Sequence, residues 1–325
     1  MMIGGILIAL AALFAVYVAA TWAPERSLEE LRNRWGRFPS IFLDVAGLQV
    51  HVRDEGPRED GCPILLIHGT SSSLHTWDGW VEVLKSKRRV IRFDLPGFGL
   101  TGPTPDGIYS IDKDIRVTVA ILDRLNIKRC VVGGNSLGGT IAWRTALTYP
   151  ARVEKLILVD SGGYSIPATS VPLAFWLADL PRIDWLVKNT LPRAIVTQTL
   201  RSVFADPRKV TPEMVERSYE IALREGNRVA LFERARQRQP FGALEHRIPE
   251  LSLPTLILWG AHDRLTPPDA ARRFHADIVG SKLVIFDELG HVPQEEDPAR
   301  TVLPVKDFLG IGGFVDCSQG TRILK

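Results

Sequence analysis

A single stretch, residues 131–140 (VVGGNSLGGT), restricts the possible fold more than any other part of the chain. Two valines run into a serine that has glycines on both sides, and residues 137–150 then keep helical spacing until Pro150 ends the pattern. Glycines at a strand-to-helix junction allow a tight and strained turn, because they lack the Cβ atoms that would collide there. The stretch therefore predicts that Ser136 stands exposed on such a turn.

The same alternation of strand and helix extends over most of the chain. Strands that alternate with helices form a mostly parallel sheet with right-handed crossovers. We therefore predict an α/β fold with a mostly parallel, eight-stranded sheet and helices on both faces. The expected strands are two within 41–56 and one each in 62–69, 88–99, 129–136, 153–161, 253–263 and 281–288, and the expected helices are 25–38, 111–127, 137–150, 268–278 and 294–309.

Residues 164–247 interrupt this alternation. Prolines divide the segment into short pieces, and it contains no convincing buried strand. We expect a helical lid whose apolar first part either packs on the main domain or lines a substrate tunnel. The predicted organisation is an N-terminal helix (1–24), a first core part (25–163), the lid (164–247), a second core part (248–309) and a poorly ordered tail (310–325).

The amino terminus carries no charged residue over positions 3–22. A helix of this length spans about 30 Å, the thickness of a bilayer core. We predict a retained transmembrane anchor and a membrane-associated protein, with a cleaved signal peptide as the alternative. Four arginines follow within residues 26–37, and the positive-inside rule then favours a cytoplasmic catalytic domain.

Composition excludes several other classes. The formal net charge is only +3, and no Lys/Arg run tracks phosphates, so nucleic acid is not an expected partner. The three cysteines, Cys62, Cys130 and Cys317, are far apart, which does not resemble a disulfide framework or a metal site. No metal and no cofactor are expected.

Residues 134–138 match the G-x-S-x-G pattern of a nucleophile on a strained turn. A serine needs a base, and His291 follows the last expected strand in a loop, where its imidazole can reach the sheet edge. Asp263 ends the preceding strand and is the expected orienting acid, with Asp160 as its rival. The order Ser136, Asp263, His291 is the Ser–Asp–His order of this kind of site.

An oxyanion needs two preorganised N–H donors. The sequence offers the amide of Leu137, directly after the nucleophile, and that of Thr70, in the loop after an earlier strand. His68 is expected to hold this loop through side-chain hydrogen bonds. The predicted substrate contacts are Gly69, Ser71, Leu74, Trp77, Asn135 and Trp176.

Taken together, the motifs resemble those of the α/β-hydrolase fold family with a helical lid. The matching pieces are HGTSS (68–72), DLPGFG (94–99), GGNSLGG (133–139), LWGAHDRLTP (258–267) and ELGHVPQEEDP (288–298). The resemblance covers residues 41–309 and implies a Ser-His-Asp triad. The N-terminal segment resembles that of membrane-bound, lid-bearing members that act on monoacylglycerols and other lipid esters.

We predict a serine hydrolase that cleaves carboxylic esters, with apolar acyl or lipid groups, through an acyl-enzyme. The alternative is hydrolysis of a C–C bond in a vinylogous diketone from aromatic ring cleavage, because that branch often reads G-N-S-x-G-G at the turn. It typically needs a lid arginine for the substrate carboxylate, and Arg182 and Arg193 are the candidates. A second alternative is a non-catalytic binding protein on the same fold.

Overall fold

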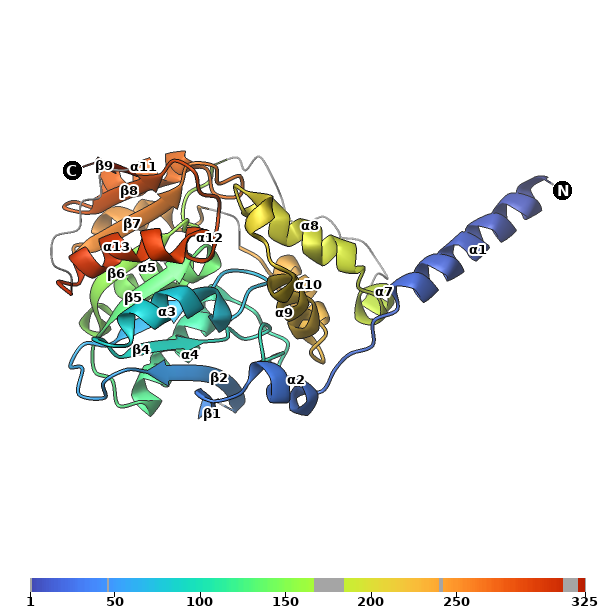
Figure 1. Ribbon diagram of the computed structural model, residues 1–325, viewed down its shortest axis with the longest axis horizontal. Coiled ribbons are helices and arrows are strands. Elements are labelled where there is room, and N and C mark those ends of the chain that lie inside the picture. The colour runs from blue at the N-terminus through green and yellow to red at the C-terminus, as the bar shows by residue number, and fades with distance from the viewer. Residues whose placement is uncertain (1, 46, 167–183, 240–241, 312–320, 325) are drawn as a thin grey trace.

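The computed structural model describes residues 2–45, 47–166, 184–239, 242–311 and 321–324 of the chain. Within these residues one sheet runs through the body of the protein, with helices on both faces (Figure 1). The strand order is β1-β2-β4-β3-β5-β6-β7-β8-β9. The strands are β1 (Ser40–Val45), β2 (Leu48–Glu55), β3 (Ile64–Ile67), β4 (Val90–Phe93), β5 (Cys130–Asn135), β6 (Val153–Val159), β7 (Thr255–Gly260), β8 (Lys282–Phe286) and β9 (Thr321–Leu324).

The central strands β4, β3, β5, β6, β7 and β8 are mutually parallel, while β1, β2 and β9 pair in antiparallel fashion at the two sides. The predicted mostly parallel sheet of eight strands is confirmed as β1–β8. A ninth strand, β9, lies in the tail for which the sequence predicted little order. Because the parallel strands share one direction, the residues that follow their carboxyl ends meet at one edge.

The central strands β3, β5 and β7 are buried along their whole length because both faces of the sheet are covered there. Successive side chains of a strand point to opposite faces. In β3, Leu65 and Ile67 belong to one core with Trp143, whereas Ile64 and Leu66 belong to a second core with the indole of Trp77. The two cores hold the sheet from both sides.

The first core is covered by α4 (Ile111–Arg124), α5 (Leu137–Thr148) and α11 (Pro268–Asp277), and the second by α3 (Asp78–Leu84) and α13 (Pro298–Phe308). The predicted helix 294–309 is divided into α12 (Pro293–Glu296) and α13. The helix is interrupted at Asp297, because the Asp297 side chain accepts a hydrogen bond from the backbone of Arg300 (3.1 Å) and caps the start of α13. The sequence analysis did not predict α3 or the 3₁₀ turn Leu74–Trp77 before it.

Between β6 and β7 the chain forms α7 (Asp184–Asn189), α8 (Arg193–Val203), α9 (Pro212–Ala222) and α10 (Asn227–Arg236). We call residues 184–239 the insertion. None of the strands described for the sheet comes from it. Proline sits in the first turn of α9, whose cap Thr211 accepts from the backbone of Met214 (3.2 Å).

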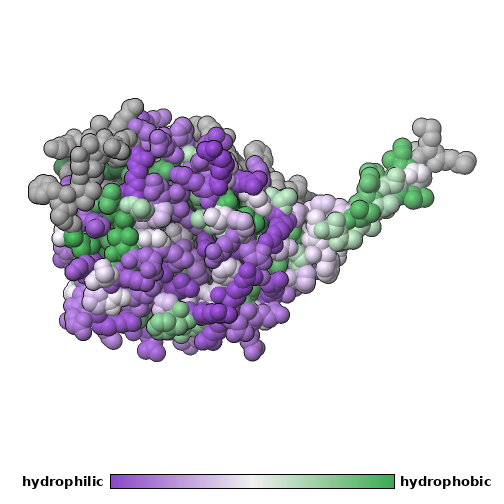
Figure 2. All heavy atoms as spheres, viewed as in Figure 1, coloured by the Kyte–Doolittle hydropathy of each residue, from purple (hydrophilic) through white to green (hydrophobic). Residues whose placement is uncertain are grey.

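The amino terminus forms α1 (Met2–Thr21), which projects from the body, and then α2 (Leu28–Trp35) (Figure 1). Hydrophobic residues, drawn in green, gather on the outer part of α1, in contrast to the mostly hydrophilic visible face of the body (Figure 2). The backbone of Leu191 donates to Thr21 (3.0 Å) and ties the end of α1 to the insertion.

One prediction for this segment is wrong. Among the residues that the structure describes, no helix combines the length and the apolar character needed to cross a membrane. This finding overturns the predicted transmembrane anchor and, with it, the membrane localisation.

Candidate active site

Ser136 lies between β5 and α5 with φ 55° and ψ −116°, a strained backbone conformation. A Cβ atom on Gly134 would lie 2.1 Å from the Gly138 carbonyl oxygen, and one on Gly138 would lie 2.1 Å from the Ile67 oxygen. Only glycine therefore fits on either side of the turn. The serine backbone is fixed further, because its N–H donates to Val159 (3.0 Å) and its carbonyl accepts from Gly162 (3.1 Å).

His291 follows β8 in the loop before α12, and its imidazole is 5% exposed. Its Nδ1 lies 2.8 Å from Oδ2 of Asp263, so the proton on Nδ1 is donated to the carboxylate. The other nitrogen, Nε2, is left to act as a base. The structure thus brings together the predicted histidine and the predicted acid.

The Asp263 carboxylate is surrounded by donors. Oδ1 accepts from the amides of Leu265 (2.8 Å) and Thr266 (3.0 Å), and Oδ2 also lies 2.5 Å from the Thr266 hydroxyl. Burial alone would raise the pKa of this carboxyl, but the charge and hydrogen bond of His291, with the bonds from Thr266, hold the pKa below its usual range. Asp263 is therefore ionised at neutral pH.

Asn135 connects the serine turn to the histidine loop. Its side-chain amide donates to the carbonyl of Val159 (3.1 Å) and to that of His291 (3.0 Å). The residue is 2% exposed, so this amide fixes two backbone segments. The contact places Ser136 and His291 at the same edge of the sheet.

The loop after β3 lies against the serine. A Cβ atom on Gly69 would be 3.1 Å from the Cβ of Ser136, so the backbone comes this close because Gly69 has no side chain. Nε2 of His68 accepts from the amide of Leu95 (2.9 Å), and its Nδ1 therefore donates to the Gly69 carbonyl (2.7 Å). Burial lowers the pKa of His68, which keeps it neutral for both bonds. The two hydrogen bonds of His68 thus fix the loop that carries the Thr70 amide.

The other residues predicted to contact the substrate, Ser71, Leu74, Trp77 and Trp176, differ in their exposure to solvent or lie outside the described residues. Ser71 is exposed and has φ 58°, whereas Leu74 and Trp77 are fully buried. The Trp77 ring packs on Trp80 in the second core, with centroids 5.0 Å apart, so it contributes to the packing of the fold. Trp176 lies outside the described residues.

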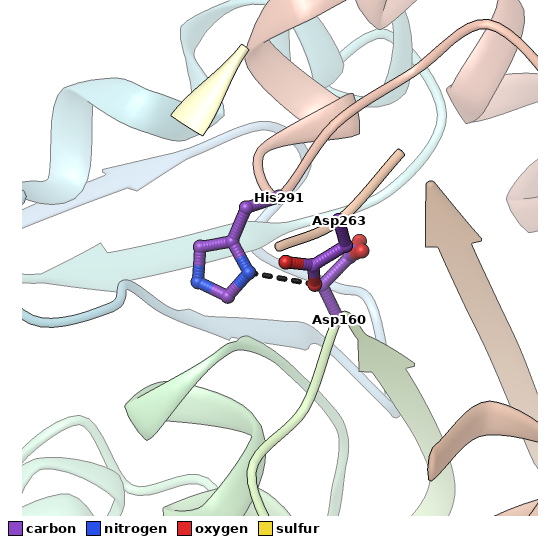
Figure 3. Close-up of side chains that lie close together, drawn as sticks. All are labelled: Asp160, Asp263 and His291. Atoms are coloured by element: carbon purple, nitrogen blue, oxygen red, sulfur yellow. Dashed lines mark hydrogen bonds and ion pairs between the residues drawn. The ribbon is translucent and has the colours of Figure 1, made fainter. Parts of the chain in front are cut away.

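Asp160, the rival acid, ends β6 beside Asp263. Its Oδ1 accepts from the amide of Gly260 (3.0 Å), and its carboxyl makes no hydrogen bond to His291 (Figure 3). The groups of Asp160, Asp263 and His291 lie within 4.8 Å of one another. Such a set could ligate a metal, but the Asp263 oxygens and Nδ1 of His291 already bond to each other and to Thr266. We therefore interpret the cluster as a hydrogen-bond network.

Sequence reasoning missed a second acid, Glu296, whose carboxylate is completely buried. It accepts hydrogen bonds from the backbone of Gly290 (2.8 Å), beside His291, and from the backbone of Ala205 (3.0 Å) and Asp206 (2.9 Å), just after α8. It joins the histidine loop to the insertion. The acidic run 295–297 was the available signal, but the sequence does not say which of its side chains turns inward.

A surface hollow of about 450 Å³ lies elsewhere. Arg129, Val153 and Leu253 line it, and these residues are at or just before the starts of β5, β6 and β7. It is therefore at the opposite edge of the sheet from Ser136. This hollow is not part of the candidate active site.

Comparison with known proteins identifies the family. The α/β hydrolase fold family matches residues 63–298. The chain therefore belongs to the α/β hydrolase fold family, as its motifs predicted.

Several individual proteins are similar to this chain in sequence or in structure. The chain is 32% identical over 282 residues to 2-hydroxymuconate semialdehyde hydrolase of Pseudomonas sp. (strain CF600), covering 83% of this chain and 94% of the relative. The structure of the meta-cleavage product hydrolase CumD from Pseudomonas fluorescens IP01 matches with a TM-score of 0.71 and 27% identity, over 83% of this chain and 97% of that one. A bacterial membrane phospholipase A matches with a TM-score of 0.71 over 95% of this chain and 97% of that one, and at 23% identity it shows the fold alone.

These comparisons correct the predicted reaction. The main prediction was a carboxylic ester hydrolase similar to monoacylglycerol lipases, whereas the two relatives of higher identity reported above are named 2-hydroxymuconate semialdehyde hydrolase and meta-cleavage product hydrolase. The preference for esters rested largely on the supposed membrane anchor, which is not upheld. The ester prediction is therefore wrong, and the stated alternative fits the comparisons better.

Proposed function

We propose that this protein is a serine hydrolase that cleaves a C–C bond in a meta-cleavage product, a dienol with a ketone or aldehyde at one end and a carboxylate at the other. The observation that carries the proposal is the turn Gly134–Gly139 (GNSLGG), whose asparagine binds the carbonyl of His291. The same turn sequence is common in that branch of the family. Relatives with this activity in their names add independent support.

The residues suit such a reaction. A carbon atom can leave only as a stabilised enolate, so the dienol must first become its keto form. The Ser136 hydroxyl then attacks the terminal carbonyl while His291 accepts its proton, and the amides of Thr70 and Leu137 bind the oxyanion. When the C–C bond breaks, the imidazolium gives that proton to the leaving carbon. Water hydrolyses the acyl-enzyme and releases the acid.

The substrate carboxylate needs a cation, and the candidates were Arg182 and Arg193. Arg193 forms an ion pair with Glu216 and stacks over the ring of Tyr219, with its guanidinium carbon 4.9 Å from the centroid. Its guanidinium is therefore already engaged. Arg182, which lies outside the described residues, is the one to test first, and R182A should raise KM more than it lowers kcat.

The deciding experiment is turnover of 2-hydroxymuconate semialdehyde and of ketone analogues with the same dienol, followed by loss of the dienol absorbance and by identification of both products. We expect S136A to lower kcat/KM by at least about 10³-fold, as loss of a nucleophile does. Labelling of the folded wild type by a fluorophosphonate at Ser136 is the control for an intact nucleophile. A labelled enzyme that turns over none of these dienols would contradict the proposal.

A further inference from the structure

The carboxyl group of Asp160 is buried beside the proposed triad but is not one of its members. The residue is 0% exposed, and Figure 3 shows its carboxyl beside that of Asp263, away from the imidazole. Oδ1 accepts the amide of Gly260, but Oδ2 is buried and receives a hydrogen bond from no residue that the structure describes. A buried carboxylate oxygen without a donor is costly.

Two ionised carboxylates do not fit this space. Asp263 has donors for both of its oxygens, whereas Asp160 has a single amide. The titratable groups that face Asp160 are Asp263, His291 and Glu296, so apart from the imidazole every nearby group is an acid. Like charges this close in a buried site force one carboxyl to keep its proton.

We propose that Asp160 is protonated in the resting enzyme and that its Oδ2–H donates to the carboxylate of Asp263. This step gives the unpartnered oxygen its missing bond, because a protonated oxygen is a donor and Asp263 is an acceptor. Burial, and then the charge of Asp263, raise the pKa of Asp160 well above its usual range, in accord with this assignment. Asp160 is then a positioning residue, and the inference rests on the proposed Ser136–His291–Asp263 mechanism.

The proton on Asp160 affects the charge that surrounds the catalytic base, His291. A neutral Asp160 adds no second negative charge beside the imidazole, so Asp263 is the carboxylate whose charge stabilises the imidazolium of His291. Its hydrogen bond also makes Asp263 a weaker base, which keeps the proton of the pair on Nδ1 of His291. An ionised Asp160 would instead place a second negative charge beside the imidazole and would give Asp263 no hydrogen bond.

The test is the same substitution at the two neighbouring carboxyls, D160N and D263N. The readout is the rate of Ser136 labelling by a fluorophosphonate from pH 5 to pH 9, whose midpoint reports the pKa of His291 in the free enzyme. In D160N the amide oxygen still accepts from Gly260 and the NH₂ group still donates to Asp263. We expect the midpoint to stay within about 0.3 unit and the rate within about tenfold, because the charge beside the imidazole is unchanged.

The matched variants should behave differently. D160A removes the donor and should slow labelling more than D160N does. D263N should lower the rate by about 10⁴-fold, because an amide favours the wrong histidine tautomer. A fall of the D160N midpoint by about one unit or more would mean that an ionised carboxylate had been removed, and would overturn the proposal.

An infrared measurement tests the proton without any reaction. The wild type at pH 7 should show the carbonyl stretch of a protonated carboxyl that moves on ¹³C labelling of aspartate and that D160N lacks. Absence of this band in the wild type would reject the inference, even if D160N failed to fold. If Ser136 did not react at all in the wild type, the proposed mechanism would fail, while the infrared band would still decide the protonation of Asp160.

Discussion

At the scale of one residue, His68 is a buried polar group that holds the loop of the proposed oxyanion donor Thr70. Its two ring nitrogens join the amide of Leu95 to the carbonyl of Gly69, which requires the neutral ring with its proton on Nδ1. The Gly69 carbonyl directly precedes the amide of Thr70. The position of the proposed oxyanion donor therefore depends on this imidazole.

We expect H68A to lower kcat/KM by about 10-fold to 100-fold, somewhat less than complete loss of an oxyanion donor costs. The effect should fall mainly on kcat, because the donor acts on the transition state. His275 on α11 is a suitable control, since its ring bonds only locally to Ser281 (2.9 Å) and H275A should stay near wild-type activity. An H68A enzyme with full kcat would show that the loop holds its shape without the ring.

At the scale of the element, the junction of β5 and α5 depends on helix residues that contradict ordinary helix preference. Gly138 is in the first turn of α5, where alanine would normally favour the helix by about 1 kcal/mol. Here a Cβ atom would overlap the carbonyl oxygen of Ile67 at 2.1 Å. Close packing of α5 on the end of β3 therefore outweighs intrinsic helix propensity.

The substitution G138A should accordingly displace the serine turn, lower the melting temperature and lower activity at least about 100-fold, because small displacements of reacting groups cost that much. Gly5 in α1 is the matched helical glycine, since nothing lies within 4 Å of the position of its Cβ atom. G5A should leave activity unchanged and should not lower the melting temperature, because the added Cβ meets no neighbour. Normal activity in G138A, measured with the dienol substrate, would contradict the packing argument.

Glu296 links two further elements, the histidine loop and the insertion. It accepts three backbone amides, and the His291 amide itself donates to Val203 at the end of α8 (2.8 Å). Neither segment is part of the sheet, so their mutual position depends on these bonds. The insertion thereby helps to fix the position of His291.

We expect E296A to reduce the free energy of unfolding by at least about 2 kcal/mol, because buried amides lose their acceptor. It should also lower kcat, since the imidazole becomes mobile. Glu288 precedes the same loop with its side chain 81% exposed, so E288A is the matched control and should be nearly neutral. Urea unfolding and steady-state kinetics of both variants would test this, and an E296A protein as stable as E288A would refute it.

At the scale of the whole molecule, buried ionisable groups determine how stability depends on pH. Burial lowers the pKa of His68 and, more strongly, that of His75, so the unfolded chain binds more protons than the native one below about pH 6.5. Stability is therefore lost as pH falls through this region. Asp160 acts in the opposite sense. Its raised pKa means that the native state keeps a proton that the unfolded chain has lost, so stability falls as pH rises.

The expected result is a maximum of stability near pH 6.5, with each group contributing a slope of about 1.4 kcal/mol per pH unit where only one state is protonated. The free energy of unfolding from urea titrations between pH 5.5 and pH 8.5 measures it. H75Q should flatten the acidic side and D160N the alkaline side. A free energy that rose steadily with pH in the wild type would argue against the proton on Asp160.

The sequence by itself determined the parts of this protein that depend on neighbouring residues. Apolar runs of strand length predicted the central strands, because a strand buried on both faces needs no alternation, and the turn residues within 41–56 predicted β1 and β2. The glycines around Ser136 predicted the strained turn, and the order of Ser136, Asp263 and His291 predicted which side chains would meet at the carboxyl edge. These features follow from local geometry and from the rules that govern parallel sheets.

Only the tertiary structure decided the rest, because those contacts join residues far apart in the chain. The carboxyl of Asp160 lies beside that of Asp263 because β6 and β7 are neighbours in the sheet, and Glu296 meets Ala205 because the insertion packs on the histidine loop. The burial of Trp77 depends on the second core in the same way. Sequence spacing does not show which of several acidic side chains is buried, because their burial depends on packing between segments that are far apart in the chain.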